Sequence, residues 1–229
     1  MNILNKLKKN HNTLTEENTT ITKEILEWFY CIIIAIIIAL FFRYFIATPT
    51  TVKMTSMFPT LKESDRLILN RTIRISNQNP NRGDIITFEA PSKQVYTDDE
   101  IEQSDKIAKY ENLSTNIWDK FIYHVLELNK TSYIKRVIAL PGEHVEIKDG
   151  NVYINGEKLQ EEYLHDNVIT NVIYPGFDDF IVPDNCIFAM GDNRTGSKDC
   201  RNFGCIPIDK IESIVLFRFW PLDKFGKVV

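Results

Sequence analysis

The chain has 229 residues, of which 44% are hydrophobic and 25% are charged, as expected for a folded protein. Its net charge of −4 and the lack of a basic helix or finger spacing argue against a nucleic-acid-binding protein. The four histidines and four cysteines show neither a zinc-ligand spacing nor an H-E-x-x-H motif, which argues against a zinc site.

The first part of the chain consists of a polar segment and a long apolar run. We expect residues 1–24 to be loosely ordered. An unbroken stretch without charge, Pro or Gly follows at 28–42, and it extends to 25–47 if Glu27 and Arg43 near its ends are included. About 20 residues of helix cross the hydrocarbon of a bilayer, so this run predicts one transmembrane anchor. A cleaved signal peptide is the alternative, but its N-terminal region would be unusually long and acidic.

The positive charges that flank this run predict its orientation in the membrane. Arg43 and Lys53 are the only cations directly after it, whereas four lysines precede it: Lys6, Lys8, Lys9 and Lys23. Under the positive-inside rule, residues 1–24 are a cytoplasmic N-terminal segment and residues 48–229 lie outside the cell membrane.

The outer part of the chain has the pattern of a β-rich domain. Short runs rich in Ile, Val and aromatic residues, bounded by turn residues, predict strands at 66–72, 85–88, 133–140, 144–148, 151–154 and 211–220. Asp149-Gly150 is a strong type I′ hairpin signal, and Asn155-Gly156 adds a second turn. We therefore predict a mostly β protein, with a compact antiparallel β domain behind one N-terminal transmembrane helix.

Residues 92–131 depart from this β pattern and are interpreted as a partly helical insertion. They are charged and polar, and four apolar residues recur at near-helical spacing: Ile117, Phe121, Val125 and Leu128. One amphipathic helix is expected to begin near residues 114–116. The sequence leaves open whether this helix covers the sheet or contacts a partner.

The cysteines allow two interpretations. Cys31 lies in the apolar run, so Cys186, Cys200 and Cys205 are expected on the outer side. A Cys200–Cys205 disulfide could form there, and unpaired buried thiols are the alternative. The sequence leaves both open.

A serine and a lysine are the remaining candidates for nucleophilic catalysis, since no histidine lies in a recognisable motif. A lysine acts as a base only when neutral, which requires burial to lower its pKa from about 10.4. Lys135 lies in the apolar run 133–142, on the same face as Tyr133 and Val137. A solvated lysine would fit the composition equally well. Ser56 lies in a loop nine residues after Ala47, within roughly 30 Å of the membrane.

Four segments, in order, resemble the conserved boxes of type I signal peptidases. Residues 56–61 (SMFPTL) resemble S-M-x-P-T-L, and residues 82–88 (RGDIITF) resemble R-G-D-I-V-x-F. Residues 135–143 (KRVIALPGE) resemble K-R-V-x-x-x-P-G-D, and residues 190–201 (MGDNRTGSKDCR) resemble M-G-D-N-R-x-x-S-x-D-S-R. These matches cover about half of the outer part, and four boxes in register behind an anchor are highly specific.

The resemblance implies a membrane-bound serine endopeptidase that removes signal peptides from secreted preproteins, cleaving after A-x-A-like sites without metal or cofactor. The matched positions make Ser56 the nucleophile and Lys135 the general base. Its partners are then preproteins and the lipid bilayer, not nucleic acid. The oligomeric state is left open.

The same match assigns supporting roles to five further residues. Ser197 corresponds to the serine that orients the lysine, and Asp199 and Arg201 correspond to a structural ion pair behind the site. Met57 and Pro59, next to the nucleophile, are expected to contact the substrate.

The chain also departs from the family pattern. Met54 replaces the Ser, Thr or Gly found two residues before the nucleophile, where a hydroxyl donates to the oxyanion. Cys200 replaces a Ser, and Glu143 replaces an Asp. The chain between the last two boxes is short, so the large second β-domain of some members is not expected. Met54 alone supports the alternative of a non-catalytic, membrane-anchored relative that binds secretory substrates, whereas retention of Ser56, Lys135 and Ser197 opposes it.

Overall fold

The computed structural model describes residues 2–76, 79–93, 100, 105–111, 116–128, 130–165 and 168–228. The chain divides into two compact units, residues 1–43 and residues 44–229.

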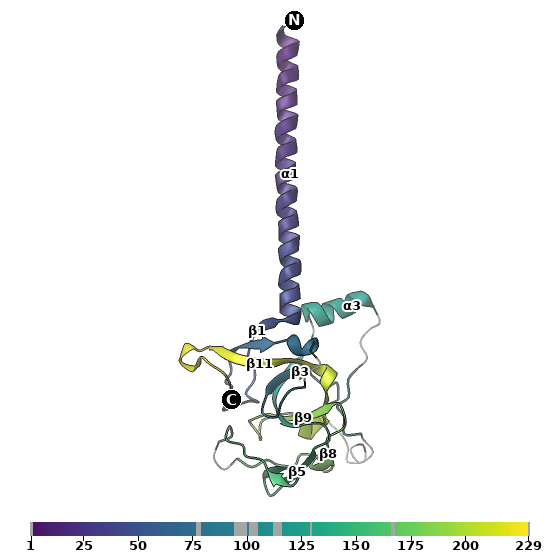
Figure 1. The fold of residues 1–229 in the computed structure, drawn as a ribbon, viewed down its shortest axis with the longest axis vertical. Helices are drawn as coiled ribbons and strands as arrows, with labels where there is room; N and C mark the ends of the chain where they lie inside the picture. Colours follow the sequence, from purple (N-terminus) through teal and green to yellow (C-terminus); the bar gives the residue numbers. More distant parts are fainter. Residues whose placement is uncertain are drawn as a thin grey trace. The chain divides into compact units, whose positions relative to one another are not determined.

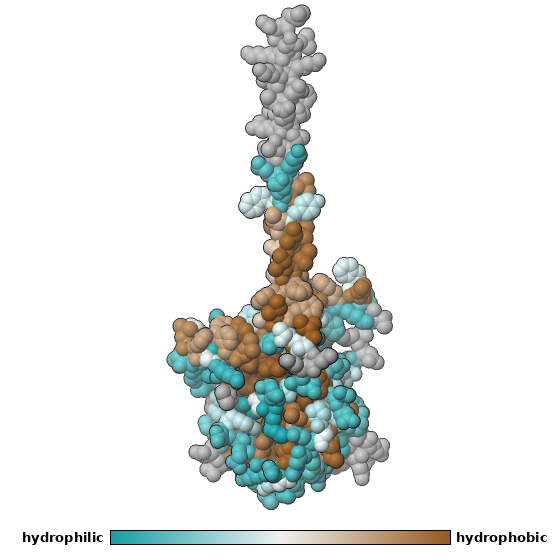
Figure 2. All heavy atoms as spheres, viewed as in Figure 1, coloured by the Kyte–Doolittle hydropathy of each residue, from teal (hydrophilic) through white to brown (hydrophobic). Residues whose placement is uncertain are grey.

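The first unit is helical. Helix α1 runs from Asn2 to Phe45, with two residues beyond the unit boundary (Figure 1). Its part from Thr22 to Phe45 has a mean hydropathy of 2.7 and no buried residue, so it is long and apolar enough to cross a membrane. Figure 2 shows most of this part in brown, with teal and pale residues at its N-terminal end.

Two expectations about the N-terminal part differ from the structure. The expected loose order of residues 1–24 is wrong, because α1 begins at Asn2 and no Pro or Gly interrupts it. The helix also ends at Phe45, before the expected end of the anchor at Ala47. Strand β1 (Ala47–Thr51) begins there, and the Ile46 carbonyl accepts a hydrogen bond from the Arg71 amide at 2.9 Å.

The second unit contains two antiparallel sheets (Figure 1). The larger sheet has the spatial order β1, β2 (Arg66–Asn70), β11 (Ile211–Trp220), β3 (Ile85–Glu89), β4 (Ser132–Ala139), β9 (Cys186–Met190) and β10 (Ile206–Pro207). The smaller sheet has the order β7 (Glu157–Lys158), β6 (Asn151–Ile154), β5 (His144–Lys148) and β8 (Asp179–Ile181). The predicted mostly β, antiparallel fold class is confirmed.

The predicted strands and turns agree closely with the structure. Strands β5, β6 and β11 have the predicted bounds, and β2, β3 and β4 differ by one or two residues at their ends. Asp149 and Gly150 have φ angles of 51° and 75°, which confirms the type I′ turn between β5 and β6. Asn155 and Gly156 also have positive φ and turn the chain into β7.

Buried side chains form two hydrophobic clusters in the second unit. The larger joins both sheets and includes Phe88, Val137 and Phe188. The smaller lies around β1, β2 and the loop after β1, and it includes Met57 and Leu61. The second cluster therefore holds the segment that follows Ser56.

The insertion between β3 and β4 contains the predicted helix. Helix α3 (Ile117–Phe121) continues into the π-helical turn η2 (Ile122–Leu126), and the Asn116 side chain caps its start by accepting a hydrogen bond from the Trp118 amide at 3.0 Å. Several other residues of the insertion lie outside the described ranges. The remaining short helices among the described residues are η1 (Thr72–Arg74), α4 (Cys200–Phe203), η3 (Ile208–Lys210) and η4 (Leu222–Lys224).

Candidate active site

Ser56 lies in the turn that follows β1. The Leu61 amide donates to the Met57 carbonyl at 2.9 Å, and both side chains are fully buried, so the turn is held on the core. The Ser56 carbonyl accepts a hydrogen bond from the Asn193 amide at 3.1 Å. Main chain and packing therefore fix the Ser56 hydroxyl, which is itself buried.

Lys135 reaches Ser56 from the middle of β4. Its Nζ lies 2.9 Å from Ser56 Oγ and 2.9 Å from the carbonyl oxygen of Ile134. The Tyr133 ring, on the same face of the strand, lies with its centroid 5.4 Å from Nζ. The alternation predicted from the sequence thus places the amine in a buried setting beside the hydroxyl, although the two residues are 79 positions apart.

Burial of Lys135 changes its protonation. Loss of solvent lowers the pKa of Lys135 from 10.5 to about 8, although the negative charge of Asp199 acts in the opposite direction. With a pKa of about 8, roughly one lysine in ten is neutral at pH 7 and half are neutral at pH 8. The site therefore supplies an amine that can accept a proton from the adjacent hydroxyl.

Asp199 and Arg201 form the expected ion pair, completely buried. Arg201 donates to both carboxylate oxygens of Asp199 at 2.9 Å, and the Gly191 amide donates to the same carboxylate at 3.0 Å. Burial by itself raises the pKa of Asp199, but the hydrogen bonds and charge of Arg201 outweigh it, so the pKa is lowered. Asp199 also caps α4 in a capping box with Asn202, which fixes the chain beside Lys135.

Ser197 lies against the loop that supports the nucleophile. A Cβ atom built on Gly191 would collide with Ser197 Oγ and with the Ser56 carbonyl oxygen, so only glycine allows this approach. Within the described ranges, Ser197 Oγ is buried and has no hydrogen-bond partner. The structure therefore brings Ser197 to the site but gives no hydrogen bond from it to Lys135.

A buried network around Asp192 also belongs to the site, and reasoning from the sequence missed it. Arg136 points away from Lys135 and donates to both carboxylate oxygens of Asp192, at 3.0 and 2.7 Å. Thr60, in the nucleophile turn, donates to the same carboxylate. The network joins β4, the 191–194 loop and the turn of Ser56. The signal in the sequence was a pair of charged residues, Arg136 and Asp192, which lie in two different recognised boxes.

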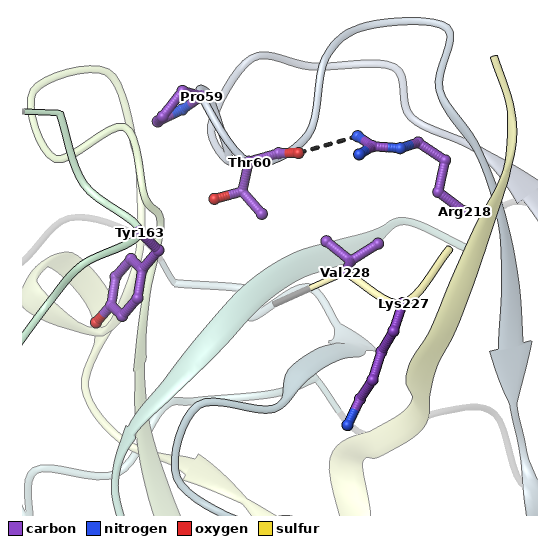
Figure 3. A pocket seen from close by; sticks show the side chains of 6 residues that line it. All are labelled: Pro59, Thr60, Tyr163, Arg218, Lys227 and Val228. Carbon is purple, nitrogen blue, oxygen red and sulfur yellow. Dashed lines mark hydrogen bonds between the residues drawn. The ribbon is translucent and has the colours of Figure 1, made fainter. Parts of the chain in front are cut away.

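The two predicted substrate contacts lie in different environments. Met57 is fully buried in the core and presents no surface to a substrate. Pro59 lines a cavity of about 360 Å³ with Thr60, Tyr163, Arg218, Lys227 and Val228 (Figure 3). Arg218 donates to the Thr60 carbonyl at 3.1 Å across this cavity. Neither Ser56 nor Lys135 lines it, so the cavity adjoins the nucleophile turn without containing the dyad.

The side chain of Met54 is 65% exposed and has no hydrogen-bond donor. Within the described part of the chain, the Ser56 amide donates no hydrogen bond to the protein. This amide is therefore free to bind a developing oxyanion. Among the described residues, the adjacent Thr55 side chain likewise makes no hydrogen bond, so its hydroxyl is also free to donate.

All four cysteines are described, and none of them forms a disulfide. Cys186, Cys200 and Cys205 are buried thiols, in agreement with the second of the two sequence interpretations. Cys200, which replaces the usual Ser, accepts a hydrogen bond from the Ala189 amide at 3.2 Å, and burial raises the pKa of its thiol. Cys200 therefore serves as a packed core residue beside the ion pair.

Comparisons with known proteins place the chain in an enzyme class. A family profile described as signal peptidase, peptidase S26, matches residues 25–220. A probable signal peptidase I-1 from Synechocystis is 34% identical over 86% of this chain and 83% of the relative. Signal peptidase I S from Bacillus subtilis is 33% identical over 93% of this chain and 99% of the relative. A solved signal peptidase I from Enterococcus faecalis aligns at 26% identity and a TM-score of 0.37, covering 60% of this chain and 97% of that chain.

The sequence matches define a hydrolase of the serine protease class. More specifically, the chain belongs to the signal peptidase family, peptidase S26, and acts in the removal of signal peptides.

Proposed function

We propose that this chain is a membrane-anchored endopeptidase that cleaves secreted preproteins after A-x-A-like sites by means of a Ser56–Lys135 dyad. One observation carries the proposal: the buried Lys135 Nζ lies 2.9 Å from Ser56 Oγ. A lysine with a lowered pKa next to a serine hydroxyl has the geometry and the protonation that nucleophilic catalysis requires.

The reaction divides into two steps. Neutral Lys135 takes the proton of Ser56 as Oγ attacks the scissile carbonyl, and the Ser56 amide donates to the developing oxyanion. Lysinium then gives its proton to the leaving amine, which leaves an acyl-enzyme on Ser56. Water, deprotonated by Lys135, releases the signal peptide and regenerates the hydroxyl.

The other assigned residues position this dyad. Asp199 and Arg201 hold the chain behind Lys135, and Ser197 packs beside the support loop that binds the Ser56 carbonyl. We assign orientation of the lysine to Ser197, and contact with the preprotein to Pro59. Met57 acts from the core by fixing the turn.

Membrane anchoring by α1 places this chemistry near its substrates. The proposed span begins at residue 25 and lies in the apolar Thr22–Phe45 part of α1, with residues 1–24 cytoplasmic and residues 48–229 outside. Only ten residues separate Phe45 from Ser56, so the nucleophile lies within roughly 36 Å of the span along the chain. A preprotein held in the bilayer by its own signal peptide presents its cleavage site in this region.

Cleavage of a preprotein by the detergent-solubilised chain tests the dyad. Ser56→Ala and Lys135→Ala should each abolish formation of the shortened product, and the double variant should be hardly slower than either. Lys148→Ala, at an exposed lysine on β5, should retain full activity as the matched control. Substantial activity of Ser56→Ala would refute the assignment. Binding of the preprotein by the wild type without any product would favour the non-catalytic alternative.

A further inference from the structure

The helical part of the insertion shows its apolar side chains to solvent. Five large hydrophobic residues form what we call the insertion patch: Ile117, Trp118, Phe121, Ile122 and Leu128, exposed by 76, 68, 38, 38 and 55%. A helix that merely covers a sheet would turn such residues inward. A cluster of this kind on the surface marks a site of interaction.

Charged residues, in contrast, hold this segment on the sheet. Arg71 donates to both carboxylate oxygens of Glu127 at 2.6 and 2.9 Å, and Arg74 donates to one of them at 3.2 Å. Lys130 forms a second ion pair with Glu212 on β11, and all these side chains are at least 85% buried. These buried ion pairs fix the orientation of α3 and η2. The outward direction of the insertion patch is therefore set by the fold.

The same two arginines contact the residues at which the chain leaves the apolar helix. The Arg74 guanidinium lies 4.9 Å from the centroid of the Tyr44 ring, and the Arg71 amide donates to the Ile46 carbonyl at 2.9 Å. Tyr44 and Ile46 belong to the second unit, so these contacts do not depend on the placement of the first. Figure 1 accordingly shows α3 near the start of β1, and Figure 2 shows apolar residues on it.

We propose that the insertion patch rests in the interface of the lipid bilayer next to the anchor. The patch shares its supporting arginines with the end of the span, and that end must lie at the interface if α1 crosses the membrane. Trp118 suits this depth, and Lys120 of α3 is exposed and can reach anionic headgroups. This inference rests on the membrane anchoring in the proposed function.

Docking at a second point would fix the orientation of the catalytic unit on the membrane. An anchor alone leaves this unit free to turn about the link at Phe45, whereas a second contact holds Ser56 at a constant height. The docking is therefore expected to raise kcat/KM for substrates that are themselves inserted in the bilayer. Soluble peptides should not benefit, because they reach the site from any direction.

Tryptophan fluorescence of the full chain in vesicles tests the docking directly. Trp28, Trp118 and Trp220 are the only tryptophans, so W28F/W220F leaves Trp118 as the sole reporter and W118F/W220F leaves Trp28. The vesicles contain phosphatidylcholine and phosphatidylglycerol, with or without bromine on the acyl chains. We expect bromine to reduce the emission of Trp118 by a fraction comparable to that of Trp28.

The reporters separate this inference from the anchoring. Quenching of Trp28 without quenching of Trp118 overturns the docking and keeps the anchor, whether the patch is bare or covers a second copy of the chain. Loss of quenching at both positions refutes the anchor and the docking together. Quenching of Trp118 alone supports the docking and refutes the anchor.

Activity provides an independent readout of the same surface. Ile117→Ser/Trp118→Ser changes two exposed side chains, and Ile181→Ser changes another largely exposed side chain, on β8 of the smaller sheet, as the control. The double variant should lose kcat/KM several-fold on a vesicle-inserted preprotein and keep it on a soluble peptide, with an unchanged Tm. The control should match the wild type on both substrates. Equal losses on both substrates, or no loss on either, would overturn the docking.

Discussion

Two neighbouring residues on β4, Lys135 and Arg136, are both buried but have different roles. Arg136 is buried with the Asp192 carboxylate bound to its guanidinium, and it serves as a link between segments. Lys135 is buried without an ion pair among the described residues, and its pKa falls to about 8. The unpaired amine is therefore the one that can act as a base.

Met54 provides a test at the same scale, because the family pattern that the chain resembles allows a Ser or Thr hydroxyl at this position as an oxyanion donor. Met54→Ser should raise kcat by up to about 10²-fold, with a much smaller change in KM, since a donor aimed at the developing charge acts in the transition state. The side chain is exposed, so the substitution leaves the core unchanged. Initial rates on one preprotein give kcat and KM separately.

Two further variants show whether the added hydroxyl causes this change in kcat. Met54→Ala removes the side chain without adding a hydroxyl and should leave kcat unchanged. If Met54→Ser also leaves kcat unchanged while Thr55→Val lowers it sharply, the oxyanion site is complete by another route.

Single residues were predictable where a motif or an alternation marked them. The face of Lys135 followed from the alternation along β4, whereas the approach of Ser56 to Lys135 required a recognised motif, since no local pattern reports a contact across 79 positions. The burial of Arg136 was not predictable, because its partner lies in a distant loop. Met57 was assigned by its position beside the nucleophile, but its apolar side chain packs into the core instead.

At the scale of elements, prediction was most complete for the hairpin of β5 and β6, where alternation and turn residues both mark the structure. The hairpin of β5 and β6 has alternating burial and a turn pair with positive φ, and both are visible in the sequence. Strand β9 is buried at every position and was not predicted, although β3, which is buried in the same way, was. Strand β1 follows the apolar run so closely that its first residue was assigned to the anchor.

The short helix α4 depends on one ion pair, which makes a stability prediction at this scale. Arg201→Ala leaves the Asp199 charge buried without its partner and should reduce the free energy of unfolding by about 3–5 kcal/mol. Arg201→Lys keeps the positive charge but loses the bidentate contact with the Asp199 carboxylate. An intermediate loss in the free energy of unfolding is therefore expected. Urea unfolding of the three proteins in detergent measures these differences. An unchanged midpoint for Arg201→Ala would show that Asp199 does not need this partner.

The whole molecule combines one apolar helix with one β unit, and charge bias on either side of the helix predicts its topology. The cations before the span predict a cytoplasmic N-terminus, and the proposed active site would then lie outside. This arrangement agrees with substrates that arrive through the membrane. It also makes the insertion patch and the span two contacts with one bilayer.

Limited trypsin digestion of right-side-out vesicles tests that topology. Exposed lysines of the second unit, such as Lys53 and Lys148, should be cut, while an N-terminal tag ahead of Lys6 stays protected. Detergent should abolish the protection, which shows that the membrane provides it. Cleavage at Lys6–Lys9 in sealed vesicles, with the second unit intact, would reverse the orientation.

The central claim is that neutral, buried Lys135 is the base for Ser56, and the pH dependence of kcat/KM tests it most directly. The pKa of Lys135 is lowered in the folded chain, so the neutral fraction grows as pH rises through about 8. The profile on one preprotein should therefore rise with pH and level off above about 8, because kcat/KM reports groups of the free enzyme. Lys135→Arg should be inactive throughout, since its guanidinium stays protonated. A wild-type profile that is flat between about pH 6 and pH 10 would contradict a lysine base.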